Sequence, residues 1–411
     1  MNNPSSDTTI ESEASQSTLQ VILANPLYRG ATIGLFLSGI GGAAATPQIA
    51  SFLVNELDAS LRTAGLFYLT SLTAPIAGYL VGARSDRTGQ RLTIFRICAI
   101  TGFIGWLAFA FSTQLWVPFL LSATILAFAG AAMSQLFAAI HDDITANPSQ
   151  QGDSVFAMIR MSVTAGWIIG PVIGTSIAAA WGTRAVLLVT AFSALAQIIP
   201  LGTIRSRTVV PHTERSLTAA APISAGTSLR TMMPLLIFTA LCLNINASEA
   251  VKHAFLPIYM TDHLELSPTI QGIVIGSQPF VEFPLIPVAV VLARRWGALP
   301  LIAIAAGIAV VGNVVFALAG GAIEVLIAQV LMGVVWGIFA AMGIIVAQRL
   351  LPTAVATASG VFMSSGAIGS AFGGFTGGLG AEAFGLPEVF FLPAIFCLVA
   401  AIGLVALHMR T

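Results

Sequence analysis

Charged side chains are scarce in this chain of 411 residues, at 8% against about 25% in a typical soluble domain. The 17 basic and 17 acidic residues cancel, so no excess positive charge would attract a nucleic acid. So little charge excludes a soluble globular enzyme, and so much apolar sequence excludes a disordered protein. Hydrophobic residues make up 56% of the chain, which indicates an all-α polytopic membrane protein.

Cysteine and histidine are also few. The three cysteines, Cys98, Cys242 and Cys397, lie in apolar runs without a CxxC pair, which favours buried thiols over disulfides. The five histidines are dispersed and lack the spacing of a metal site. No P-loop, HExxH or GxSxG motif is present. We therefore expect no metal, no cofactor and no enzymatic activity.

Long apolar runs are what the chain has in abundance. A bilayer-spanning helix needs about 20 mostly apolar residues, and twelve such runs can be followed. They cover residues 30–54, 63–83, 92–112, 115–139, 155–180, 184–204, 232–260, 268–293, 298–319, 323–348, 354–381 and 387–408. The domains predicted from them are a polar, disordered cytoplasmic tail (1–24), a six-helix bundle (25–204), a central cytoplasmic loop (205–230) and a second six-helix bundle (231–411).

The basic residues predict the orientation of these spans. With the N-terminus inside the cell, thirteen of them fall in cytoplasmic segments and only Arg62 and Arg184 fall outside. This positive-inside bias places both termini in the cytoplasm. The remaining two, Arg160 and Lys252, lie within spans.

The two halves of the chain resemble each other. Pro47, Gly65 and Ala83 have counterparts 207–210 residues later, and the run from Ala131 to Met133 recurs from Ala340 to Met342. Two pseudo-symmetric halves of six helices joined by a central loop are typical of transporters.

The loop after the second run carries a strong motif. It reads Gly82-Ala-Arg-Ser-Asp86-Arg87-Thr-Gly89-Gln-Arg91, and this resembles the signature that the major facilitator superfamily has at this place. Gly82 would let helices pack closely, Gly89 would permit a tight turn, and Asp86 can pair with an arginine or sit at a helix N-terminus. The resemblance implies the major facilitator fold of twelve transmembrane helices, with this loop latching the cytoplasmic side in the outward-facing state. A merely basic topogenic loop is the alternative.

The fifth run carries a second motif, built on Gly166, Gly170, Pro171 and Gly174. It resembles the antiporter signature of the same superfamily, and this resemblance implies export. The proline removes one helix hydrogen bond, and the glycines allow close contact with a neighbouring span. Ordinary packing of small residues is the alternative interpretation.

Several segments are similar to the bacterial sugar efflux transporters within the superfamily. They are Met133-Ser-Gln135-Leu-Phe-Ala, the stretch from Arg160 to Trp167 and Pro171, and Glu282-Phe-Pro284. The chain departs from that family at Ser134, where the family has proline, and in the loop after the eighth run, which has fewer basic residues. This resemblance implies a sugar or a sugar-like compound as the substrate.

Ionisable residues within spans are candidates for function, because burying a charge in the bilayer costs about 2.5–3.5 kcal/mol on insertion scales. Glu282 is the first candidate for the proton site, since a carboxyl group in a low-dielectric cleft can load and release a proton near neutral pH; a structural hydrogen bond is the alternative. Glu249 is the second candidate, and it shares a helix face with Lys252 at i+3 and His253 at i+4. The alternative is that these three residues form a structural ion cluster. Arg160 is expected to pair with Asp142 or Asp143 in a structural or gating role.

Neutral polar residues and tryptophans inside the spans are the candidates for substrate binding. Sugars are bound by amide and carboxylate hydrogen bonds and by an aromatic ring on the apolar sugar face, whereas interhelical hydrogen bonding is the alternative for each amide. The candidates are Gln48, Gln135, Trp167, Asn244, Asn246, Gln278, Asn313 and Trp336.

The function expected from these features is proton-coupled efflux (antiport) of a small solute, with a sugar or sugar-like compound as the solute that the resemblance implies, by alternating access. The protein would be a monomer in the bacterial cytoplasmic (inner) membrane, with protons, the solute and the lipid bilayer as its partners and no nucleic acid. A multidrug or amino-acid/metabolite exporter of the same fold is the alternative, and a non-transporting membrane receptor is a third hypothesis.

Overall fold

The computed structural model describes residues 17–147, 151–202, 204 and 229–409, and in this part of the chain every regular element is helical. The first half contains α2 (Thr18–Ala24), α3 (Pro26–Ala45), α4 (Ile49–Leu57), α5 (Leu61–Phe67), α6 (Ala74–Thr88), α7 (Arg91–Ala110), α8 (Trp116–Leu121), α9 (Ala127–Ala129), α10 (Ala132–Ala146), α11 (Gly152–Trp181) and α12 (Thr183–Ala196). The second half contains α13 (Leu229–Asp262), α14 (Pro268–Trp296), α15 (Ala298–Leu318), α16 (Ala322–Leu350), α17 (Val355–Phe384) and α18 (Phe391–His408). Short 3-10 or π turns join or extend some of these helices, among them η1 (Thr46–Gln48) and η2 (Tyr68–Thr73).

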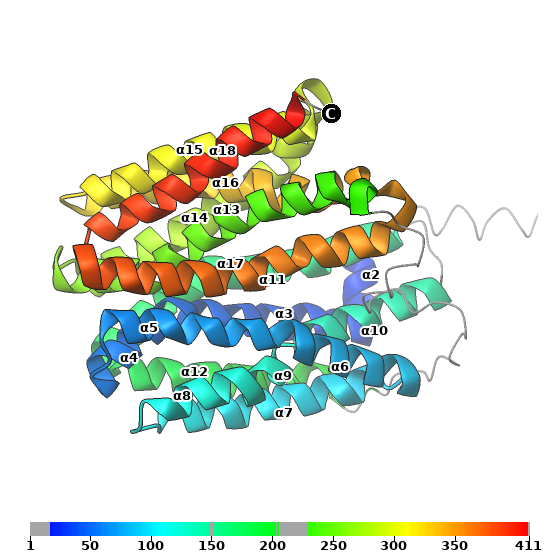
Figure 1. Ribbon diagram of the computed structural model, residues 1–411. Helices are drawn as coiled ribbons and strands as arrows, with labels where there is room; N and C mark the ends of the chain where they lie inside the picture. Colours follow the sequence, from blue (N-terminus) through cyan, green and yellow to red (C-terminus); the bar gives the residue numbers. More distant parts are fainter. Residues whose placement is uncertain (1–16, 148–150, 203, 205–228, 410–411) are drawn as a thin grey trace, which may run out of the picture.

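The long helices run side by side in two bundles, with α11 and α17 between them (Figure 1). Eleven helical segments in the described residues are long and apolar enough to span a membrane. The twelfth span, predicted over 354–381, is the 30-residue helix α17. It is packed against α5 and α13. The protein is therefore an all-α polytopic membrane protein with the predicted two six-helix bundles.

The tail prediction is wrong for its last residues. Residues 18–24 form α2, whose N-cap Ser17 makes a reciprocal capping box with Gln20, and Ile22 is buried against the bundle. Residues 1–16 of the predicted tail and 205–228 of the predicted central loop lie outside the described residues, and Leu229 and Arg230 already belong to α13.

The glycines of the antiporter-like motif let the backbone of α11 pack directly against α3. A methyl group added at Gly166, Gly170 or Gly174 would come within 2.8 Å of α3 atoms. Pro171 lies inside the helix, and its carbonyl oxygen accepts a hydrogen bond of 2.9 Å from Thr175 Oγ1. The predicted close contact of this motif is confirmed, because only a residue without a side chain fits at these three positions.

Glycines also join the two bundles. We call the end where α2 and the last turn of α18 lie the terminal end, and the opposite end the far end (Figure 1). In the far half, a methyl group at Gly272 of α14 would lie 2.8 Å from Val172 Cα of α11, and one at Gly378 of α17 would lie 2.9 Å from Gly65 Cα of α5. Arg62 and Glu382 form an ion pair of 3.8 Å near the same end. The far end is thus closed by backbone-to-backbone contact.

Candidate functional site

A cavity of about 200 Å³ lies between the two bundles. Its wall is made by α3, η1 and α11 of the first bundle and by α13, α14 and α16 of the second. The lining residues are Ala43, Pro47, Trp167, Pro171, Glu249, His253, Ile275, Gln278, Pro279, Glu282, Gln329 and Trp336. Both bundles therefore contribute to the wall of this cavity.

Glu249 is the centre of a buried polar cluster on this wall. Its side chain accepts hydrogen bonds from Lys252 Nζ (2.6 Å), Gln278 Nε2 (2.9 Å) and Trp336 Nε1 (2.8 Å), and His253 Nε2 lies 3.3 Å away. Glu249 is 7% exposed and Lys252 is 1% exposed. A buried ion pair is tolerated only when further hydrogen bonds satisfy both charges, and this cluster supplies them from three helices.

Lys252 completes the cluster from the side away from the cavity. Its ammonium group also donates to Gln278 Oε1, so the Gln278 amide bridges both members of the ion pair. The predicted i, i+3, i+4 arrangement of Glu249, Lys252 and His253 is confirmed. Its partners Gln278 and Trp336 come from α14 and α16, the neighbouring helices.

Glu282 lies one helical turn beyond Gln278 on α14 and lines the same cavity. It interacts electrostatically with both Glu249 and Lys252. Among the described residues no hydrogen bond or ion pair to its carboxyl group is found. The carboxyl group is therefore available to a proton or to a solute.

The structure separates the substrate-binding candidates into two groups. Trp167, Gln278 and Trp336 line the cavity as predicted. Five others do not: Gln48, Gln135, Asn244, Asn246 and Asn313. The expectation that these five line the solute cavity is not met.

Two of the amides away from the cavity make hydrogen bonds between helices, which was the alternative interpretation. Asn246 donates to Ser365 Oγ of α17 at 3.3 Å, and Asn313 donates to Ser248 Oγ at 3.0 Å, directly behind Glu249. Asn244 donates to the Ala240 carbonyl of its own helix. Gln48 and Gln135 are buried in η1 and α10.

Gln329 of α16 is a cavity residue that the sequence interpretation missed. Its Nε2 donates to the Val274 carbonyl oxygen at 3.2 Å, and its Oε1 has no hydrogen-bond partner among the described residues. It is an amide inside the apolar run over 323–348, so the criterion that selected the other candidates would also have found it.

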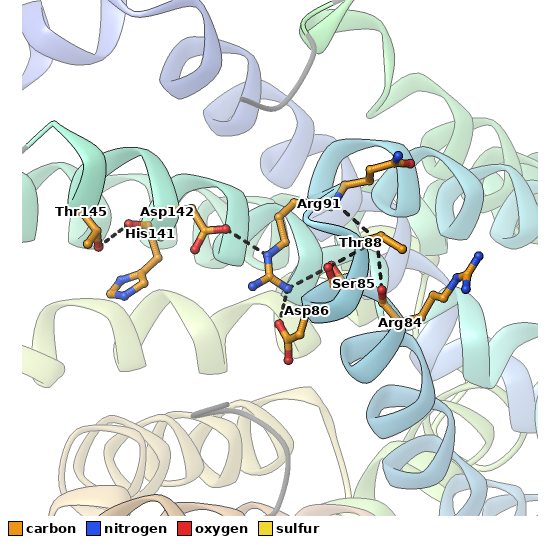
Figure 2. Close-up of polar contacts among 9 residues, drawn as sticks. Arg84, Ser85, Asp86, Thr88, Arg91, His141, Asp142 and Thr145 are labelled. Carbon is orange, nitrogen blue, oxygen red and sulfur yellow. Dashed lines mark hydrogen bonds and ion pairs between the residues drawn. The ribbon is translucent and has the colours of Figure 1, made fainter. Parts of the chain in front are cut away.

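The loop motif forms an ion-pair network within the first bundle (Figure 2). Arg91 contacts Asp86 at 2.5 Å and Asp142 of α10 at 3.0 Å, and it donates to Ser85 Oγ. Gly89 ends α6 with a φ of +63°, as expected for the tight turn. Asp86 thus pairs with an arginine, which was one of the two predicted roles, while Arg87 is exposed.

Two predictions about charged and small residues are wrong. Arg160 makes no ion pair with Asp142 or Asp143, because Asp142 is taken by Arg91, and Asp143 accepts a hydrogen bond from Asn25; Arg160 itself is exposed on α11. Gly82 does not bring helices together, since a methyl group there would meet no atom within 4 Å.

Comparison with known proteins gives consistent results. The sequence profile of the Major Facilitator Superfamily matches residues 31–251 and 247–411. Sugar efflux transporter A of Dickeya chrysanthemi is 25% identical over 351 residues, which cover 85% of this chain and 87% of the relative. Multidrug resistance protein MdtG of Proteus mirabilis is 24% identical over 272 residues, 65% of each chain. Among solved structures, the nucleoside transporter NupG matches with a TM-score of 0.78 at 18% identity, over 93% of this chain and 99% of that one.

Proposed function

The chain belongs to the Major Facilitator Superfamily, and on that premise we propose that it exports a sugar or a sugar-like solute in exchange for protons. The observation that carries the proposal is the cavity between the bundles, where the Glu282 carboxyl group has no hydrogen-bond or ion-pair partner among the described residues and lies beside a buried ion cluster. The similarity to sugar efflux transporters supports the solute class. The protein would work as a monomer in the bacterial inner membrane.

Coupling follows from competition at Glu282. An ionised carboxylate accepts hydrogen bonds from a solute, whereas a protonated carboxyl group is neutral and has lost part of that capacity. Glu249 is held in its cluster by Lys252, so Glu282 is the group that changes state. A proton entering from the outer side displaces the solute, and its release to the cytoplasm restores the solute site.

The conformation fits one step of alternating access. With both termini in the cytoplasm, the far end is the outer side, and its glycine contacts close it. The structure then corresponds to an inward-facing state. In this state the contacts described for Asp86 and Arg91 stay within the first bundle, and engagement of the latch with the second bundle belongs to the outward-facing state.

A multidrug exporter is the second candidate function. The tryptophans Trp167 and Trp336 and the prolines Pro47, Pro171 and Pro279 give the cavity apolar walls, which suit a lipophilic solute. The similarity to a multidrug resistance protein supports this candidate. A non-transporting receptor would bind a solute without moving protons.

Inside-out membrane vesicles with an imposed proton gradient test these functions together. Sugars and lipophilic cations are added one at a time, and dissipation of the gradient is recorded, with vesicles that lack the protein as the control. Dissipation by sugars supports sugar export, and dissipation by lipophilic cations alone supports a drug exporter. Vesicles in which bound solute causes no dissipation would contradict proton coupling.

A further inference from the structure

Two side chains of the cavity wall, Glu282 of α14 and Gln329 of α16, have a hydrogen-bond acceptor without a hydrogen-bond partner among the described residues. This pair of acceptors bears on which solutes the proposed transporter selects, and the inference therefore rests on the proposed function.

The donors of Trp336, Gln278 and Lys252 are directed to Glu249. The indole of Trp336 has a single N–H group, and this group is used in the 2.8 Å hydrogen bond to the Glu249 carboxylate. The Gln278 amide donates to the same carboxylate and accepts from Lys252. Lys252 does not line the cavity and is 1% exposed. Glu249 thus removes these donors from competition for a solute.

Gln329 offers the opposite kind of group. A backbone carbonyl oxygen can only accept a hydrogen bond, so the amide atom of Gln329 that contacts the Val274 carbonyl oxygen must be Nε2. The other terminal atom of the amide is therefore Oε1. This oxygen is buried without a partner, although Gln329 is only 1% exposed and lines the cavity. A buried carbonyl group without a partner is unfavourable, and a donor from a bound solute would satisfy it.

Glu282 is the second open acceptor, and its position relative to Gln329 is held by close helix packing. A methyl group at Gly333 of α16 would lie 2.8 Å from the Gln278 carbonyl oxygen, and one at Gly337 would lie 3.2 Å from that of Glu282. The two helices are thus in near-backbone contact between the two acceptors. A rigid pair of acceptors selects solutes by the arrangement of their donors.

We propose that Gln329 and Glu282 form a specificity site that takes a solute through its hydroxyl or ammonium donors and rejects solutes that carry a carboxylate or phosphate. Gln329 contributes a neutral acceptor, and Glu282 contributes an anionic one. An anionic solute would place its charge beside Glu282 in a low-dielectric cavity and would find the N–H donors of Gln278 and Trp336 already bound to Glu249. Like charges juxtaposed in this way strongly disfavour binding.

The test compares solutes that share one carbon skeleton. The six compounds are glucose, glucosamine, glucuronate, galactose, galactosamine and galacturonate. Each is titrated into the purified full chain, and binding is followed by tryptophan fluorescence. We expect at least one neutral or amino sugar to bind, and its uronate to bind about a hundredfold or more weakly. Binding of a uronate as tight as that of its parent sugar, or binding of none of the six compounds, would overturn the proposal.

Variants then test the role of Gln329 in solute binding. Gln329→Leu removes the acceptor at similar size and is expected to weaken binding about tenfold. Gln135→Leu is the matched control, because Gln135 also has a buried Oε1 without a partner among the described residues but does not line the cavity. Equal affinity of Gln329→Leu and wild type would refute the role of Gln329. Binding without proton movement in vesicles would contradict the proposed function and leave this specificity intact. Proton-coupled export of uronates would support the proposed function and refute this specificity.

Discussion

Replacing Lys252 by methionine tests whether its charge stabilises the buried carboxylate of Glu249. The substitution keeps an unbranched side chain that is one atom shorter, and it removes the charge that lies 2.6 Å from Glu249. Removing one partner of a buried ion pair typically costs about 3–5 kcal/mol, because the other charge stays buried without compensation. Glu249 retains hydrogen bonds from Gln278 and Trp336, so we expect a loss near the lower limit, about 3 kcal/mol.

The assay is thermal or denaturant unfolding of the purified protein in detergent. The double variant Glu249→Gln with Lys252→Met removes both charges and should recover most of the lost stability, since no uncompensated charge remains. Arg62→Met is the matched control, because its pair with Glu382 is 3.8 Å long and both side chains are about half exposed; it should change stability by about 0–1 kcal/mol. A Lys252→Met protein as stable as wild type, or a double variant no better than Lys252→Met, would refute the reasoning.

Three further predictions concern the transport cycle. Glu282→Gln should abolish proton-coupled flux while the protein stays folded and membrane-inserted, as judged by gel filtration and vesicle assays; coupled transport at the wild-type rate would contradict the proton site. Asp86→Asn should slow turnover with little change in solute affinity, because it weakens the 2.5 Å contact to Arg91 far from the cavity, and an unchanged rate would remove the latch from the cycle. Gly374→Ala places a methyl group against the Tyr68 side chain and should keep the far end open, which raises the labelling of a cysteine introduced near that end; unchanged labelling would show that closure does not depend on this contact.

The helices were predictable because a membrane span must satisfy its backbone within one continuous apolar segment. All of the predicted runs correspond to helices, including the glycine-rich run that became α17. The prediction failed at 18–24, where composition alone was read as disorder and the local capping signal from Ser17 to Gln20 was overlooked.

Contacts between residues of the site were predictable only where the residues share a helix. Glu249, Lys252 and His253 are linked by i+3 and i+4 spacing, which any helix would bring together. Which amides face the cavity depends on how each helix is rotated, and spans that are apolar on every side carry little information about rotation. For this reason the criterion selected Asn313, which lies away from the cavity, whereas Gln329 meets the same criterion and was overlooked. Arg160 was paired with the wrong acids for a similar reason, because Arg91 competes for Asp142 from another helix.

The contact between α11 and α14 has a mechanical consequence. Its centre lies near Val172, so about 9 residues of α11, or about 14 Å, lie toward the far end and about 20 residues, or about 30 Å, lie toward the terminal end. If the bundles rock about this contact, the longer arm moves about twice as far as the shorter one. The mouth at the terminal end then opens wider than the mouth at the far end. The largest cargo that can leave would accordingly be set by the narrower far mouth, whatever the central cavity can admit.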